Sequence, residues 1–251
     1  MKGKVRPVSL GRKLVIDLMH ASVPLVIVKR TLKLERLVTA RTALTVRPGW
    51  TPIIAKAFCI VARDEPSLRS YYLKWPWPHF YELPCSIVMA PIIRESFDPD
   101  VPLLMKLGSA NDFSLTEIDA IIQRSKTAPL DEVPALKRVL RITRMPLPLR
   151  RLLWAVSLNI GRQRANHFGT LAITSLATLG SETTVANSPG PSLITYGLVR
   201  PDNSMELLFH WDHRIFDGVL AARALQRLEE VLNNEIADEL LAMSRRPSGQ
   251  E

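Results

Sequence analysis

The sequence predicts a single α/β domain, an α+β sandwich in which a mixed β-sheet packs against flanking helices. Short runs of branched apolar residues, typical of buried strands, occur at 25–34, 84–93, 169–175, 192–199 and 205–211. Apolar residues recur at helical spacing in 52–63, 114–127 and 218–242. The chain has 251 residues, which suits one large domain, and no repeat or low-complexity linker divides it.

Other elements rest on local signals. A short helix is predicted over 35–44. Thr51 is expected to cap the next helix, with Pro52 at its first position. Ser114 is expected to cap the helix that ends at residue 127. Segment 70–82 is rich in aromatic residues and proline, and its two inner prolines exclude a central strand or a helix. It could line a pocket or form a packed loop.

The positive charge is concentrated in one part of the chain. The net charge is +9, and no Asp or Glu occurs between Val133 and Ser181. Residues 136–160 of this stretch are basic and apolar, and two prolines divide them into two predicted short helices. Such a segment attracts anions: nucleotide phosphates, an acidic carrier protein, a phospholipid surface or nucleic acid. Composition does not choose among these partners.

The sequence offers no sign of a disulfide framework, a metal site or a membrane span. Cys59 lies in an apolar run and is expected to be a buried thiol, and Cys85 has no evident partner. No Cys/His group has the spacing of a zinc site, so no metal is expected. No secretory signal follows Met1, and no apolar run reaches about 20 residues. We expect a cytoplasmic protein, with peripheral membrane contact as an open alternative.

The strongest chemical signal follows the strand 205–211. His213 comes directly after the strand end, Asp217 follows four residues later, and Gly218 then leads into a helix and is expected to allow a tight turn. A histidine titrates close to neutral pH, so it suits a general base that deprotonates a thiol or hydroxyl. A histidine that only supports the structure is the alternative interpretation.

A family resemblance supports the catalytic interpretation. Residues 209–225 read FHWDHRIFDGVLAARAL and resemble the C-terminal signature of the 2-oxoacid dehydrogenase acyltransferases, the dihydrolipoamide acyltransferase components. That signature is Asp-His-Arg-x-x-Asp-Gly followed by an Ala-Ala-Arg helix. Segments similar to the family in order and spacing lie at 7–15, 52–69, 86–94 and 169–180. The resemblance covers most of residues 5–240 and implies a chloramphenicol-acetyltransferase-like fold.

The resemblance also implies roles for single residues. His213 would take the thiol proton from coenzyme A or a dihydrolipoyl-type carrier, and the thiolate would attack an acyl thioester. The family's oxyanion-binding serine falls on Thr174, with Ser175 beside it, and which hydroxyl donates stays open. Both could also be ordinary strand residues.

The resemblance further implies structural support for the histidine loop. Asp217 would pair with an arginine of an N-terminal helix predicted over 10–20, and Arg12 is the matching position, preferred to Lys13 because a guanidinium can pair bidentately. Arg214 would brace the same loop or face solvent. The family implies a homotrimer with the active site in a channel between subunits, and larger assemblies are compatible with it.

The sequence departs from the family in two further places. No lipoyl domain is visible, so we expect no lipoyl group of its own and an acyl group supplied by a separate carrier or a free thioester. The basic helical insert, about 136–164, is longer than the family's equivalent. It could dock an acidic acyl-carrier or lipoyl protein, lie on an anionic membrane through its leucines and Trp154, or form a solvated cap. Nucleic acid is disfavoured because the arginines alternate with apolar residues. The tail 244–251 is expected to be loose.

Two functions follow. The first is an acyltransferase that moves an acyl group between coenzyme A, or a carrier-bound thioester, and a thiol, amine or alcohol. The second is a non-catalytic trimeric scaffold derived from the same family, which the shift to Thr174 leaves open. Of the other histidines, His210 is the best candidate for a secondary role because it points to the opposite sheet face from Trp211.

Overall fold

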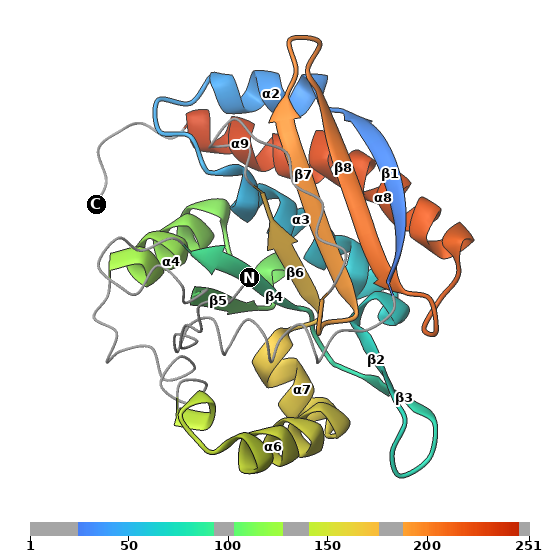
Figure 1. Ribbon diagram of the computed structural model, residues 1–251. Helices are drawn as coiled ribbons and strands as arrows, with labels where there is room; N and C mark the ends of the chain where they lie inside the picture. The colour runs from blue at the N-terminus through green and yellow to red at the C-terminus, as the bar shows by residue number, and fades with distance from the viewer. Residues whose placement is uncertain (1–24, 93–102, 128–140, 176–187, 246–251) are drawn as a thin grey trace, which may run out of the picture.

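The computed structural model describes residues 25–92, 103–127, 141–175 and 188–245. The predicted helix 10–20, Arg12 and Lys13 therefore lie outside the described residues, as do residues 136–140 and 246–251. The described part contains a six-stranded mixed sheet in the order β1-β8-β7-β6-β4-β5 (Figure 1). Its strands are β1 (Leu25–Lys33), β4 (Ile87–Ile92), β5 (Leu103–Gly108), β6 (Leu171–Thr174), β7 (Ser192–Val199) and β8 (Ser204–Asp212).

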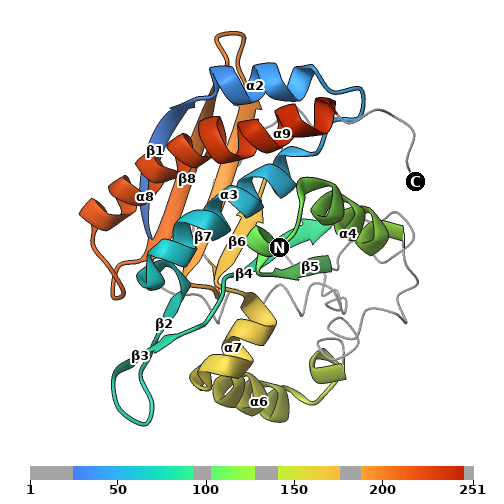
Figure 2. The ribbon, with the colours of Figure 1, turned by 180° about the vertical axis from the view of Figure 1, so that it is seen from behind.

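Helices α2 (Glu35–Thr42), α3 (Trp50–Asp64), α8 (Gly218–Val231) and α9 (Ala237–Ser244) cover one face of this sheet, as the view from behind shows (Figure 2). Helix α4 (Leu115–Thr127) packs beside α3, and α6 (Leu147–Asn159) and α7 (Gly161–Phe168) pack together beyond the lower end of the sheet. A π-helical turn (Leu232–Ile236) joins α8 to α9, so the predicted closing helix 218–242 forms with an irregular middle. Short 3-10 turns occur at Pro66–Arg69 and Ala110–Asp112. These elements confirm the predicted α/β class.

The main core lies between the sheet and α3 and α8. On β8 the alternate residues Met205, Leu207, Phe209 and Trp211 are buried in it. Phe209 meets Phe58 of α3 with ring centroids 5.8 Å apart. Strands β4, β6 and β7 run parallel, and the other neighbours are antiparallel. Because β8 is antiparallel to β7, its C-terminal end lies beside the start of β7, and residue 213 leaves the sheet at that end of the strands.

Of the two predicted helix caps, Ser114 is confirmed and Thr51 is wrong. Ser114 forms a reciprocal cap with Glu117: its hydroxyl accepts from the Glu117 amide at 3.2 Å, and its own amide donates to the Glu117 carboxylate at 2.7 Å. Thr51 does not cap α3, which begins one residue earlier at Trp50. The Thr51 hydroxyl instead pairs with the Tyr196 hydroxyl at 2.7 Å, so a tertiary contact replaces the cap.

The aromatic segment 70–82 is not a loop throughout. It forms a separate two-stranded hairpin, β2 (Ser70–Leu73) with β3 (His79–Glu82). The two prolines at 76 and 78 fall in the connection between the strands, where no ladder hydrogen bond is needed. Strand β5 was not predicted, because its sequence LLMKLG is too short to distinguish from a loop by pattern.

Candidate active site

His213 is the first residue after β8, and its side chain is exposed. Its ring lies 5.9 Å from the Trp211 ring, with the planes tilted by 30°. Among the residues that the structure describes, no hydrogen-bond partner contacts the imidazole. The ring is therefore open to an incoming proton donor from solvent.

An ion pair between the two neighbours of His213 holds the loop. The Asp212 carboxylate is buried and accepts from the Arg214 Nε at 2.8 Å, its Nη2 at 2.6 Å and its backbone amide at 3.1 Å. Hydrogen bonding to Asp212 raises the pKa of Arg214. The guanidinium also lies 4.7 Å above the Tyr72 ring of β2. Arg214 thus braces the loop, although its side chain also remains partly exposed to solvent.

The base of the loop is fixed by aromatic stacking. Phe209, Trp211 and Phe216 stack with interplanar angles of 20° or less. The Trp211 Nε1 donates to the Phe216 carbonyl at 3.0 Å and so closes the loop around His213. This contact was not predicted, because the stacking depends on the turn bringing residue 216 back over β8.

Asp217 caps α8. Its Oδ1 accepts from the Leu220 amide at 2.9 Å, which satisfies one of the free amides at the helix start. The predicted partner Arg12 lies outside the described residues. The expectation that the turn at Gly218 depends on glycine is wrong. A Cβ at this position would meet nothing within 4 Å, and the φ of Gly218 is not in the left-handed region. The turn into α8 therefore does not need glycine.

The structure does not bring Thr174 and Ser175 to His213 within one chain. Thr174 ends β6 opposite Thr195 of β7, which lies opposite Leu208 of β8. Leu208 precedes His213 by five positions, about 17 Å along a strand, and β6 lies two strands from β8, about 10 Å across. The Ser175 hydroxyl donates to the Tyr196 carbonyl at 2.8 Å.

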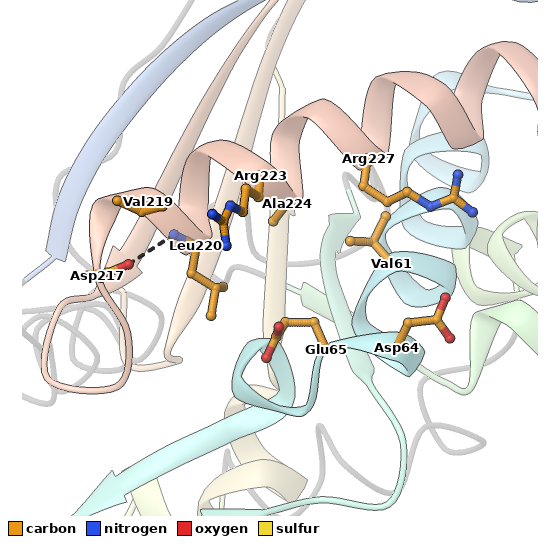
Figure 3. A pocket seen from close by; sticks show the side chains of 9 residues that line it. All are labelled: Val61, Asp64, Glu65, Asp217, Val219, Leu220, Arg223, Ala224 and Arg227. Carbon is orange, nitrogen blue, oxygen red and sulfur yellow. Dashed lines mark hydrogen bonds between the residues drawn. The ribbon is translucent and has the colours of Figure 1, made fainter.

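A groove of about 500 Å³ lies beside the same loop, between the end of α3 and the start of α8 (Figure 3). Asp217 lines it from the loop, Arg223 and Arg227 from α8, and Asp64 and Glu65 from the end of α3. His213 is not among its lining residues. Acidic and basic side chains both line the groove, so it favours neither an anionic nor a cationic ligand. The groove is therefore not the candidate active site.

No described residues form a group of three His, Cys, Asp or Glu side chains that could hold a metal ion. Cys59 is buried, and burial raises its pKa to about 12, which leaves the thiol protonated and unreactive at neutral pH. His210 is fully buried, and burial lowers its pKa. Neither ring nitrogen of His210 has a hydrogen-bond partner in the part of the chain that the structure describes.

Several solved structures share this fold. The dihydrolipoamide acetyltransferase of Azotobacter vinelandii, studied for the roles of a serine, a histidine and an asparagine in its catalytic mechanism, is 18% identical over 94% of this chain and 93% of that chain, with a TM-score of 0.65. A truncated catalytic core of the 2-oxoacid dehydrogenase multienzyme complex from Thermoplasma acidophilum is 16% identical over 92% and 99%, with a TM-score of 0.63. A probable dihydrolipoamide acetyltransferase of Listeria monocytogenes is 16% identical over 98% of both chains, with a TM-score of 0.61.

No protein-family model and no curated protein sequence matches the chain. The structural likeness shows the fold: the chain has the fold of the catalytic cores of dihydrolipoamide acetyltransferases of 2-oxoacid dehydrogenase complexes, as predicted from the His213 motif.

Proposed function

We propose that the chain is an acyltransferase that moves an acyl group between coenzyme A, or a carrier-bound thioester, and a thiol, amine or alcohol acceptor, with His213 as the general base. The observation that carries the proposal is the exposed imidazole on a braced loop at the end of β8. In the Azotobacter enzyme the histidine and asparagine under study are four positions apart. His213 and Asp217 have the same spacing.

The step needs only one base and one oxyanion donor. A ring nitrogen of His213 takes the proton of the attacking thiol, and the thiolate adds to the thioester carbonyl. The tetrahedral oxyanion then collapses, the C–S bond to the first thiol breaks, and the imidazolium returns the proton to the departing thiolate. General-base help of this kind contributes about 100- to 10,000-fold in rate.

The oxyanion donor comes from a second copy of the chain in this proposal. Thr174 and His213 of one chain lie too far apart to reach one substrate atom. In the proposed symmetric trimer, the end of β6 of one copy lies against the His213 loop of the next. Thr174 is the better donor, because the single Ser175 hydroxyl proton is already donated to Tyr196.

The test is conversion of acetyl-CoA and longer acyl-CoA esters to free coenzyme A, separated by chromatography, with dihydrolipoamide as the first acceptor and S-acyl-dihydrolipoamide as the second product. His213→Ala is expected to lower turnover at least 100-fold and to leave the unfolding midpoint unchanged, since the side chain is exposed. His79→Ala is the matched control, because His79 lies on the separate hairpin. The native mass is expected to be three times that of the chain.

A non-catalytic trimeric scaffold is the second candidate. The observation that favours it is the absence of any described hydrogen-bond partner that would fix the His213 tautomer, which a histidine base usually has. If the trimer forms but neither wild type nor His213→Ala turns over any of these donors, the scaffold replaces the enzyme as the conclusion.

A further inference from the structure

Helix α6 presents its apolar side to solvent. Leu149, Leu152 and Val156 are 46%, 60% and 50% exposed, and Ile160, just beyond the helix end, is 48% exposed. Their spacing of three and four residues places them on one face. We call these four residues the α6 stripe. A helix of a folded domain normally turns such a stripe toward the core, so this orientation needs an explanation outside the packing of the described residues.

The opposite side of α6 already makes the contacts that dock it. Trp154 is buried against Phe168 and His167, with ring centroids 5.5 and 5.4 Å away. Arg150 is buried as well, and its Nη1 donates to the Thr143 carbonyl at 3.2 Å. An arginine thus faces inward while leucines face outward. The stripe is not required to hold α6 in place.

The charged side chains that flank the α6 stripe in the sequence are all positive. Four exposed arginines lie on α6 and its flanks: Arg141, Arg144, Arg151 and Arg162. No Asp or Glu occurs anywhere between Val133 and Ser181 to neutralise them. An apolar stripe whose flanking sequence carries arginines and no carboxylates is complementary to a surface with an apolar interior and anionic groups at its boundary.

The β2–β3 hairpin projects from the same end of the molecule as α6 (Figures 1 and 2). Trp75, Trp77 and Phe80 are 63%, 67% and 60% exposed, and residues 66–81 contain no Asp or Glu. The hairpin packs on the start of α7, since a Cβ at Gly161 would come within 2.4 Å of the Tyr81 ring. The hairpin and α6–α7 therefore belong to one packed unit.

We propose that this end of the molecule, formed by the α6 stripe, the four arginines and the hairpin residues Trp75, Trp77 and Phe80, binds the surface of an anionic phospholipid bilayer. Leucine and aromatic side chains enter the boundary of the acyl region, and arginines contact phosphate groups. Helix α6 has 13 residues, and no described helix is long and apolar enough to cross a bilayer, so the contact is parallel to the surface.

The lipid partner explains two features that an acidic carrier protein does not. The tryptophans lie around the turn of a hairpin and the stripe lies on a helix, so the apolar groups come from two separate projections rather than one groove. Tryptophan and arginine both favour the bilayer interface, where one end of the side chain is apolar and the other wet. The surface contains no residue of the His213 loop, so this inference stands or falls apart from the proposed activity.

The test is co-sedimentation of the full chain with vesicles of equal parts phosphatidylcholine and phosphatidylglycerol, compared with pure phosphatidylcholine. We expect binding to the anionic vesicles at low salt, at least tenfold weaker on the neutral ones, that falls as salt rises. Binding should also shift the tryptophan emission to shorter wavelength, since Trp75 and Trp77 leave water.

Two double variants separate the apolar and cationic contributions. L152S with V156S is expected to weaken vesicle binding at least tenfold at all salt concentrations. R151Q with R162Q is expected to weaken it at low salt and to flatten the salt dependence. The matched controls are V46S with L198S, which are exposed apolar residues elsewhere, and R124Q with R245Q, which are exposed arginines elsewhere. All eight side chains are exposed, so all variants should keep the unfolding midpoint of the wild type.

Three outcomes of these experiments would overturn the lipid-binding proposal. If wild type does not bind anionic vesicles at low salt, or the stripe variant binds as well as its control, the proposal is overturned. If the stripe variant instead lowers the native mass while vesicles remain unbound, a second copy covers the stripe. If only an acidic acyl-carrier or lipoyl domain binds, and the stripe variant abolishes that binding, the surface docks a protein and the lipid proposal is wrong.

Discussion

Asp212 and Arg214 form a bidentate ion pair that spans His213, with Nε–Oδ1 at 2.8 Å and Nη2–Oδ2 at 2.6 Å. The Asp212 side chain is 3% exposed, whereas the Arg214 side chain is 40% exposed and covers Tyr72. The pair therefore shields a buried charge from one side. Because His213 is the residue between them, its backbone direction depends on this pair.

Arg214→Gln should disturb catalysis more than stability. It leaves the buried Asp212 carboxylate without its fork of donors, but the arginine's exposure limits the loss to about 1–2 kcal/mol, below that of a fully buried pair. We expect kcat to fall about tenfold or more with a small change in KM, because His213 loses its position but the substrate surface is kept. Arg214→Lys should recover only part of this, since it cannot pair bidentately.

The control for this change is Arg200→Gln, which removes an exposed pair with Glu206 near the β7–β8 turn. It should cost less than about 1 kcal/mol and leave kcat unchanged. Equal kinetics for Arg214→Gln and Arg200→Gln would show that the Asp212–Arg214 pair does not position His213.

Two substitutions of Asp217 distinguish its role as a helix cap from a role of its negative charge. Asp217→Ala removes the acceptor for the Leu220 amide and should destabilise the fold by about 1 kcal/mol in denaturant unfolding. Asp217→Asn keeps an acceptor of the same shape and should recover most of that stability. If Asp217→Asn is as unstable as Asp217→Ala, the negative charge matters more than the cap, and an ion pair such as the one predicted with Arg12 becomes the better explanation.

The sequence predicts those parts of the fold in which periodicity and local signals agree. Strand β7 and helix α4 match their predictions because each combines a strong apolar pattern with a turn or a cap at its boundary. The hairpin was missed because its prolines lie between two strands of four residues, each too short to show alternation. Thr51 was misjudged because its partner, Tyr196, is distant in sequence.

In the candidate site, too, features that are local in sequence could be predicted, and features that depend on the tertiary fold could not. The motif identifies His213, Asp217 and Arg214 because they are neighbours in sequence. The placement of Tyr72 over Arg214 could not be predicted, since it requires the hairpin to fold against the end of β8. The separation of Thr174 from His213 also depends on the strand order β8-β7-β6, which pattern alone does not give.

Two glycines near the site should respond in opposite ways. Gly169 has φ +62°, and a Cβ there would lie 2.5 Å from the Ile87 carbonyl oxygen. Gly169→Ala should therefore cost more than about 2 kcal/mol, from strain and collision together. Gly218→Ala should be neutral or stabilising by up to about 1 kcal/mol, because the position is open and helical.

Urea unfolding of both variants measures the difference. A destabilised Gly218→Ala would mean that residues outside the described part of the chain, or a second copy, approach this position. An unchanged Gly169→Ala would mean that the β4–β6 edge can shift to admit a methyl group.

His210 should make stability fall with acidification. It lies on β8 opposite Ile27 and Leu193, fully buried, and burial lowers its pKa. Below its unfolded pKa of about 6.5 the unfolded chain takes up a proton that folded His210 resists, so its contribution is complete above that pH and is lost as pH falls. Glu206, on the same face of β8, stays ionised over pH 7.5 to 5.5, since its hydrogen bond from Lys29 lowers the pKa of Glu206.

Denaturant unfolding of wild type and His210→Leu between pH 7.5 and 5.5 tests this. The variant should lose part of the pH dependence and be at least as stable at pH 5.5, because it removes two buried nitrogens that lack described partners. His79→Ala, on the separate hairpin, is the matched control for removal of an imidazole. If His210→Leu is strongly destabilised at pH 7.5 and its slope is unchanged, the imidazole has a partner that stabilises it, and burial alone does not set its pKa.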